Sequence, residues 1–364
     1  MSRPTHIYID LSRLRNNFLV ARRLHGARLL AVIKANAYGH GAVSCAHALS
    51  SVADGFAVAT VEEGIELRQA GVTLPVVVLE GVFSASEFDS VVKHQLTPVL
   101  HQEWQVQALL KQGGHYGAGF WIKLDSGMHR LGFSPQDLPR IVHMLQTGSR
   151  HRPLTVMTHF AHADSGRKEA VESALALFCK ATAGLAVETS LANSAAILGY
   201  PEARGDWGRP GLMLYGHDPA GSVLSPREGL QPVMSLRSQI FGERWVPPGD
   251  TVGYGGLFVA QRPSRIGIIP CGYADGYPRT APQGTPVWVA GHRVPLVGRV
   301  SMDMLTVDLT DVPQVTVGAQ AELWGDHVPV SDLASRCGTI AYELLCHVKR
   351  APFQYFFGDS VASC

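Results

Sequence analysis

One pattern constrains the fold more than any other feature of the sequence. Between residues 29 and 216, a short run rich in β-branched residues, a turn and a stretch with helical periodicity follow one another repeatedly. Strand-like runs occur at 29–34, 55–59, 75–79, 97–100, 119–124, 154–159, 188–192 and 212–215. Eight such units favour a closed parallel (β/α)₈ barrel over an open doubly wound sheet. No G-x-G-x-x-G motif follows the first run, which also argues against an open dinucleotide-binding sheet. We predict an α/β fold that begins with a TIM-like barrel.

Several helices of this barrel have readable ends. Thr60-Val-Glu-Glu63 and Ser84-Ala-Ser-Glu87 fit a capping box, and Ser134-Pro135 offers an N-cap followed by a proline. Gly71 and Gly148 stand where two helices should stop.

The character of the sequence changes after about residue 230. Strand-like segments separated by Pro/Gly turns replace the helical pattern, namely PVMSLRSQIFGERWV, DTVGYGGLFVA, RIGIIPCGYADG, TPVWVAGHRVPLVGRVSMDMLTVDL and AELWG. We therefore expect a mostly β C-terminal domain, with domains at 1–230 and 231–364 and a junction within 221–232. A length of 364 residues suits two such domains.

Composition excludes several classes of protein. The 31 basic and 30 acidic side chains nearly cancel, so neither a nucleic-acid partner nor a membrane surface is expected. The first residues lack the apolar core of a signal peptide, which favours a cytoplasmic protein. Six cysteines occur without a C-x-x-C pair, and the H-x-x-H of His159 and His162 has no convincing third ligand. We expect no disulfide framework and no metal.

Polar residues that follow barrel strands should meet at one face, because the carboxyl ends of the strands converge there. Lys34 ends the first run, His159 ends the sixth, and the remaining candidates are Lys123, Asp125, Arg130, Asn193, Ser194 and the segment 209–212. This set is rich in cations. A lysine that is desolvated among other cations is favoured as the neutral amine, which attacks carbonyl groups. The ordinary alternative for Lys34 is a lysine that snorkels at the end of a strand.

Lys34 lies in the segment IKANAYGHG, which resembles the lysine motif of alanine racemases. These are pyridoxal-phosphate enzymes with an N-terminal barrel and a C-terminal β domain. The lysine segment alone resembles several barrel-type pyridoxal enzymes, but further motifs of the family follow in order. They are KLDSGMHRLG (123–132), THFAHAD (158–164), NSAA (193–196), RPGLMLYG (209–216), VGYGG (252–256), CGYADGYPR (271–279), GRVSMDM (298–304) and YEL (342–344).

The resemblance implies an isomerase that interconverts L-alanine and D-alanine with pyridoxal 5'-phosphate, as a homodimer with shared active sites. Its product would supply cell-wall synthesis, or the enzyme would serve alanine catabolism. A broad-specificity or serine racemase of the same fold is one alternative. A non-catalytic pyridoxal-phosphate-binding protein is another, but such carriers normally lack the β domain. The β domain therefore favours an enzyme.

The resemblance also assigns the two bases. Lys34 would form the Schiff base with the cofactor aldehyde, and Tyr254 would act as the second base, delivered from the other subunit. Racemisation removes a proton on one face and returns it on the other, so two flanking groups suit it. A phenol is a poor base at neutral pH unless nearby cations stabilise the phenolate. Taken alone, Tyr254 between glycines would be read as an aromatic residue of a hairpin turn.

Two arginines take roles from the same resemblance. Arg209 would face the pyridine nitrogen and keep it unprotonated, with His159 hydrogen-bonded to this arginine. Arg130 would orient the substrate carboxylate. Lys123 aligns with a lysine that is carbamylated in some relatives and then positions Arg130. An ordinary ion pair between Lys123 and Asp125 is the alternative.

The remaining assignments concern the phosphate and the substrate pocket. Hydroxyl groups and backbone amides would bind the cofactor, and the resemblance places these roles at Tyr38, Asn193, Ser194, Gly211, Leu212 and Tyr342. Ser194 would serve equally well as a helix cap. Met302 and Asp303 would lie near the substrate from the second subunit, and Tyr273 would line the entrance.

Overall fold

The computed structural model describes residues 3–112, 119–149, 154–219 and 229–358. The chain divides into two compact units, a barrel unit (Leu14–Gln231) and a β unit (Met1–Arg13 with Pro232–Cys364). We expected residues 1–230 to form the first domain. The first thirteen residues belong instead to the β unit, because strand β1 (His6–Asp10) pairs there with β10 (Met234–Gln239) and β19 (Phe353–Phe356).

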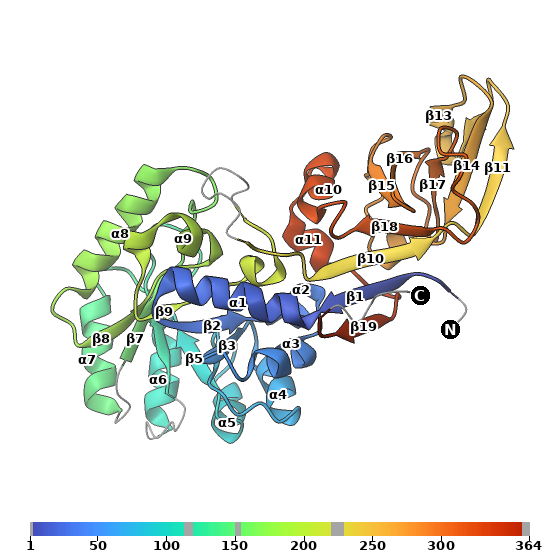
Figure 1. Cartoon of the computed structure of the whole chain (residues 1–364). Coiled ribbons are helices and arrows are strands. Elements are labelled where there is room, and N and C mark those ends of the chain that lie inside the picture. Colours follow the sequence, from blue (N-terminus) through green and yellow to red (C-terminus); the bar gives the residue numbers. More distant parts are fainter. Residues whose placement is uncertain (1–2, 113–118, 150–153, 220–228, 359–364) are drawn as a thin grey trace. The chain divides into compact units, whose positions relative to one another are not determined.

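The barrel unit contains the predicted parallel barrel (Figure 1). Its strands pair in the order β8-β7-β6-β5-β4-β3-β2-β9. A bridge between Asn193 and Arg209 and a 2.9 Å hydrogen bond from Arg209 N to Ala192 O join the two ends of this order. The bounds are β2 (Arg28–Val32), β3 (Gly55–Val58), β4 (Val76–Val78), β5 (Thr97–Leu100), β6 (Trp121–Lys123), β7 (Leu154–Met157), β8 (Val187–Ser190) and β9 (Trp207–Gly208).

The predicted eighth strand, 212–215, is wrong. Leu212–Tyr215 forms a buried 3₁₀ helix, η2, and the short β9 before it completes the barrel. The sequence Leu-Met-Leu-Tyr is continuously apolar, and a short apolar run does not distinguish a buried strand from a buried helical turn.

Helices connect the strands of the barrel. They are α1 (Leu11–His25), α2 (Lys34–Gly39), α3 (Ala42–Leu49), α4 (Val61–Gln69), α5 (Glu87–Lys93), α6 (Glu103–Lys111), α7 (Leu138–Gly148), α8 (Lys168–Thr182) and α9 (Ser194–Gly199), with the 3₁₀ helix η1 (Pro201–Ala203). Thr60 caps α4 as predicted, since its side chain accepts from Glu63 N. The predicted cap at Ser84 is wrong, because Ser86 is the residue that precedes α5. Ser134 accepts from Asp137 N at 3.1 Å as a cap would, but it does so in a turn four residues before α7 begins.

The β unit is built around a sheet with the strand order β11-β14-β17-β16-β15-β18-β10-β1-β19. All its pairings are antiparallel except β1 with β19. The further bounds are β11 (Gly242–Val246), β12 (Thr251–Val252), β13 (Phe258–Val259), β14 (Ser264–Ile269), β15 (Pro286–Val289), β16 (His292–Val297), β17 (Leu305–Asp308) and β18 (Gln320–Trp324), with α10 (Val330–Cys337), α11 (Ala341–Cys346), η4 (Tyr254–Gly256) and η5 (Tyr273–Asp275). This unit is the predicted mostly β domain.

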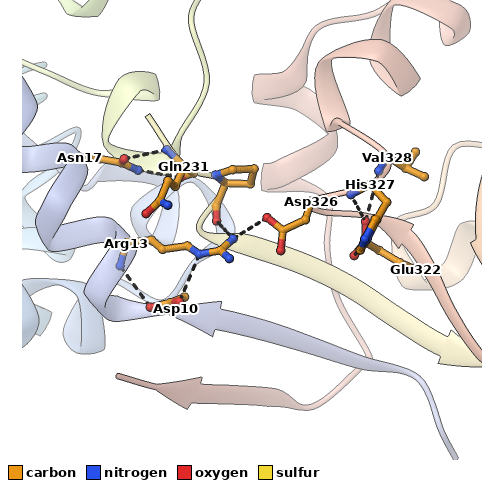
Figure 2. A network of polar contacts seen from close by, with 9 residues as sticks. Asp10, Arg13, Asn17, Gln231, Glu322, Asp326, His327 and Val328 are labelled. Carbon is orange, nitrogen blue, oxygen red and sulfur yellow. Dashed lines mark hydrogen bonds and ion pairs between the residues drawn. The ribbon is translucent and has the colours of Figure 1, made fainter. Parts of the chain in front are cut away.

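Polar contacts secure the chain within each unit near the points where it passes from one to the other (Figure 2). In the β unit, Arg13 Nη1 donates to Asp326 Oδ1 at 2.5 Å and to Pro232 O at 3.1 Å. In the barrel unit, Asn17 and Gln231 exchange two hydrogen bonds of 2.8 and 2.9 Å. No helix within the described residues is long and apolar enough to cross a membrane.

Candidate active site

Lys34 begins α2, one residue beyond the first barrel strand, β2. Residues 29 to 33 are buried, whereas Lys34 itself is half-buried. The backbone then adopts the left-handed helical conformation, which L-amino acids rarely adopt. The φ angles are 51°, 52°, 54° and 51° at Ala35, Asn36, Ala37 and Tyr38. A left-handed conformation costs roughly 1–2 kcal/mol per residue, so it persists only where its surroundings enforce it.

Two side chains of this segment bond to its own backbone. His40 Nδ1 lies 3.0 Å from Ala37 O and 2.9 Å from Tyr38 O, so this nitrogen carries the ring proton and donates it. Burial lowers the pKa of His40 to about 3, which keeps the imidazole neutral. Asn36 Oδ1 accepts from Ala42 N at 2.8 Å, at the start of α3. The turn is therefore held in part by its own polar side chains.

Lys34, Lys123, Arg130 and Arg209 form a cation cluster at the carboxyl ends of the strands. Burial lowers the pKa of Lys123 to about 8, and the charges of Arg130, Arg209 and Lys34 lower it further than the opposing charge of Asp125 raises it. The alternative ion pair of Lys123 with Asp125 is absent from the part of the chain that the structure describes. The Asp125 carboxylate instead accepts from Gly127 N and His129 N, each at 3.0 Å.

Arg209 is buried at the end of β9. Its Nη1 donates to Ser190 Oγ at 2.5 Å, and its Nη2 donates to Thr158 O at 2.6 Å and Leu191 O at 3.1 Å. Burial lowers the pKa of Arg209 to about 10, so the guanidinium stays charged at neutral pH.

His159 lies among the same cations. Burial first, and then the charge of Arg209, lower the pKa of His159 to about 3. The predicted hydrogen bond between Arg209 and His159 is not present among the described residues, where the Nη atoms of Arg209 donate to Ser190 Oγ, Thr158 O and Leu191 O.

A second cluster contains Tyr38, Ser194 and Gly211. Ser194 Oγ accepts from Gly211 N at 2.8 Å and from Met213 N at 3.3 Å, which leaves its hydroxyl hydrogen to donate elsewhere. A Cβ atom at Gly211 would lie 2.6 Å from Tyr38 Oη, so only glycine permits this approach. Leu212 follows as the first residue of η2.

Asn193 supplies the cap of α9. Its Oδ1 accepts from Ala196 N at 3.0 Å, and Ser194 is the first residue of the helix. Ser194 is therefore not the helix cap, and its hydroxyl has another use.

Tyr254 begins η4, between β12 and β13 of the β unit. Its side chain is 70% exposed, and Gly253 and Gly255 on either side adopt φ angles of 76° and 75°. Tyr342 lies on α11 in the same unit.

The structure brings Tyr273 next to Met302 and Asp303. Tyr273 N donates to Ser301 O at 3.1 Å, and Ala274 N donates to Met302 O at 3.0 Å. Arg350 Nη2 donates to Asp303 Oδ1 at 2.8 Å, which fixes the loop further.

Sequence reasoning did not find several residues that hold the site. Ser190 and Thr158 accept hydrogen bonds from Arg209, but a hydroxyl and a carbonyl at strand ends carry no sequence signal. His40 and Asn36 are visible in the sequence as polar residues of the lysine segment, but their bonds to the backbone carry no sequence signal. Within the described residues, no group of His, Cys, Asp or Glu side chains is arranged to hold a metal ion.

Comparison with known proteins agrees with this architecture. Two family profiles match, "Alanine racemase, N-terminal domain" at residues 9–219 and "Alanine racemase, C-terminal domain" at 233–355. An alanine racemase of Pseudomonas taetrolens is 51% identical over 97% of this chain and 99% of the relative. A catabolic alanine racemase of Pseudomonas putida matches to the same extent.

Solved structures give the same result in three dimensions. The biosynthetic alanine racemase of Pseudomonas aeruginosa superposes with a TM-score of 0.92 at 46% identity, covering 97% of this chain and 99% of the other. The alanine racemase of Bartonella henselae with covalently bound pyridoxal phosphate superposes with a TM-score of 0.88 at 29% identity, covering 97% and 99%. This protein is a member of the alanine racemase family.

Proposed function

We propose that the protein interconverts L-alanine and D-alanine with pyridoxal 5'-phosphate bound covalently to Lys34. The observation that carries the proposal is the half-buried amine at the end of β2, set among Lys123, Arg130 and Arg209. Relatives that are named alanine racemase and match nearly the whole chain support the proposal. This chain is similar to both a biosynthetic and a catabolic alanine racemase. Supply of D-alanine to the cell wall and alanine catabolism therefore both fit, and we propose that the enzyme acts in the cytoplasm.

The chemistry of the barrel unit fits this cofactor. Gly211 leaves room beside Tyr38 Oη, and the Ser194 hydroxyl has a hydrogen to donate. These groups would bind the phosphate together with Leu212, Asn193 and Tyr342. When bound, the cofactor withdraws electrons from the α-carbon of the amino acid and so acidifies its hydrogen.

Arg209 would donate to the ring nitrogen of the cofactor. Because the guanidinium remains protonated at neutral pH, it keeps that nitrogen unprotonated. With this nitrogen unprotonated, less electron density would be drawn from the substrate α-carbon into the ring. Protonation at a cofactor carbon, and hence transamination, would then be disfavoured. His159, neutral beside it, adds no competing charge.

Lys34 would hold or release the proton at one face of the substrate α-carbon, and the partner subunit's Tyr254 at the other. The exposure of Tyr254 in its own chain fits a side chain that completes a neighbouring site. We therefore propose a homodimer with shared active sites, in which Met302 and Asp303 border a small pocket and Tyr273 lines the entrance.

Arg130 would bind the substrate carboxylate, and Lys123 would position Arg130 as a carbamate. A pKa of about 8 gives Lys123 a substantial neutral fraction, and only a neutral amine reacts with CO₂. As the Nζ–C bond forms, one C=O π bond of CO₂ opens to an oxygen lone pair and Nζ gives one proton to solvent water, so the product carries a negative charge. Three neighbouring cations would stabilise that charge.

Racemisation of a panel of single amino acids by the purified protein tests the proposal, with Tyr254→Phe in parallel. Alanine should be the preferred substrate, and the variant should lose about 10²–10⁴-fold in two-way activity, the usual contribution of a general base. Preference for a much larger amino acid or for serine would point to a broad-specificity or serine racemase. Full activity of Tyr254→Phe would exclude the phenol as a base.

A further inference from the structure

Glu63 connects two strand ends of the barrel through one carboxylate. Its Oε1 accepts from Ala35 N at 2.7 Å, and its Oε2 accepts from Ala59 N at 2.6 Å. Ala35 comes directly after Lys34, and Ala59 comes directly after β3, the parallel neighbour of β2. Glu63 thus reaches from the first turn of α4 to the backbone on both sides of the β2–β3 pair.

This arrangement exceeds what a helix cap needs. In a capping box the third residue of the helix returns to the amide of the capping residue, which here is Thr60. The Glu63 carboxylate goes to Ala59 and Ala35 instead, while the Thr60 hydroxyl accepts from Glu63 N at 3.4 Å. One of its two bonds therefore serves a segment outside the helix and its cap.

The segment that receives this bond is the strained one. Ala35 is the first of the four residues with positive φ. The backbone hydrogen bonds of the turn begin two residues later, with Ala37 N donating to Ile33 O, so the N–H of Ala35 bonds to Glu63 instead. A charged acceptor at this position holds the peptide plane that directly follows the Cα of Lys34. Relaxation of Ala35 toward right-handed backbone would swing that plane away.

We propose that Glu63 is a positioning residue: it holds Ala35 in the left-handed turn and thereby fixes the direction of the Lys34 amine and of the Tyr38 hydroxyl. The turn lies between these two groups, so one carboxylate sets both. This inference deepens the proposed function, because the positioned amine is the one proposed to bind the cofactor and move the proton.

The variant Glu63→Gln tests the proposal sharply, because an amide keeps one acceptor oxygen and places an N–H₂ group against the other backbone N–H. Two controls match it. Thr60→Ala weakens the same helix start without contacting Ala35, and Glu62→Gln removes a neighbouring exposed carboxylate. Hydrogen exchange of the peptide 33–41 is measured in the full-length protein with and without pyridoxal phosphate, together with kcat and KM for alanine.

We expect faster exchange confined to this peptide in Glu63→Gln, and a kcat lowered by about tenfold to a hundredfold at little-changed KM, as for the loss of a charge-assisted hydrogen bond. Adding Ala35→Gly should restore part of kcat, since glycine adopts positive φ without strain. The controls should resemble the wild type. If Thr60→Ala reproduces the Glu63→Gln pattern, or if exchange of the peptide is unchanged in Glu63→Gln, the proposal is overturned.

The exchange experiment does not depend on the reaction. A wild-type protein that fails to racemise alanine would refute the proposed function, while the exchange of peptide 33–41 would still decide whether Glu63 holds the turn. Should Glu63→Gln melt far below the wild type, Ala35→Gly is compared with the double variant Ala35→Gly/Glu63→Gln, in which residue 35 adopts positive φ without strain. Equal exchange of peptide 33–41 in wild type, single and double variant would overturn the proposal.

Discussion

At the scale of single residues, the site is defined by cations that have no carboxylate partner in the part of the chain that the structure describes. Arg209 is 4% exposed and bonds to a hydroxyl and two carbonyl oxygens, with no carboxylate in an ion pair with it among the described residues. Lys123 is 7% exposed among three other cations. An uncompensated positive field of this kind attracts anions, and it also favours the neutral form of an amine.

Lys123 gives a prediction with a pH dependence. Its pKa, lowered from the ordinary value to about 8, means that the neutral amine becomes the major form above that pH. At a fixed concentration of dissolved CO₂, carbamate at Lys123 should therefore increase from pH 7 to pH 9. Carbon-13 NMR after labelling with ¹³C-bicarbonate measures it.

The exposed Lys111 serves as an internal comparison, and Lys123→Ala as the blank. A carbamate signal that persists in Lys123→Ala, or one that is flat over this pH range, would contradict the assignment.

At the scale of elements, two irregular pieces of backbone make the site. The left-handed turn of α2 carries Lys34 and Tyr38, and η2 begins beside Gly211 and Ser194. Tyr38 also packs against Tyr215 of η2, with ring centroids 4.9 Å apart. The two elements pack against each other, so a change in one should displace the Tyr38 hydroxyl, which lies between them.

Gly211→Ala tests this coupling. The new methyl group would meet Tyr38 Oη at 2.6 Å, well inside van der Waals contact, so the phenol has to move. We expect weaker retention of pyridoxal phosphate, by about tenfold or more if one hydrogen bond to the phosphate is lost. Titration of cofactor-free protein by absorbance measures the affinity.

Gly229→Ala is the matched control, because nothing lies within 4 Å of a methyl group there, although its φ of 81° adds some backbone strain. Equal cofactor affinity for Gly211→Ala and the wild type would show that Tyr38 does not contribute to binding.

The same two elements show how far local sequence reasoning reaches. The Thr60 cap and seven of the barrel strands follow from patterns within a few residues of each position. Neither the 3₁₀ helix at 212–215 nor the left-handed turn at Ala35 does, because the first is decided by burial and the second by Glu63, His40 and Asn36. The catalytic assignments depended on the ordered motifs of a family, and geometry alone would not have separated Lys34 from an ordinary lysine at a strand end.

At the scale of the whole molecule, the β unit leaves large apolar side chains uncovered. Trp245 is 64% exposed and lines a hollow with Val252 and Met304, next to the turn that carries Tyr254. Such a patch is typical of an interface. We expect a second copy of the chain to be the occupant, because the homodimer proposed above would also place Tyr254 in a neighbouring barrel.

Trp245→Glu should therefore shift the proposed dimer toward monomer and lower alanine racemisation in parallel, because a buried unpaired charge is costly at an interface. Sedimentation velocity over a range of concentrations measures the oligomeric state. Val317→Glu changes an equally apolar, 53% exposed side chain outside the hollow and should leave the dimer intact. A monomeric wild-type protein with full activity would contradict the shared site.

The pairing of β1 with β10 and β19 has a consequence for synthesis on the ribosome. The barrel segment emerges before β19 has been translated, so β1 leaves the tunnel hundreds of residues ahead of one of its two neighbours. Until β10 and then β19 have been translated, the nascent chain carries an apolar strand that lacks both partners and afterwards one of them, and a chaperone can bind this strand in that period.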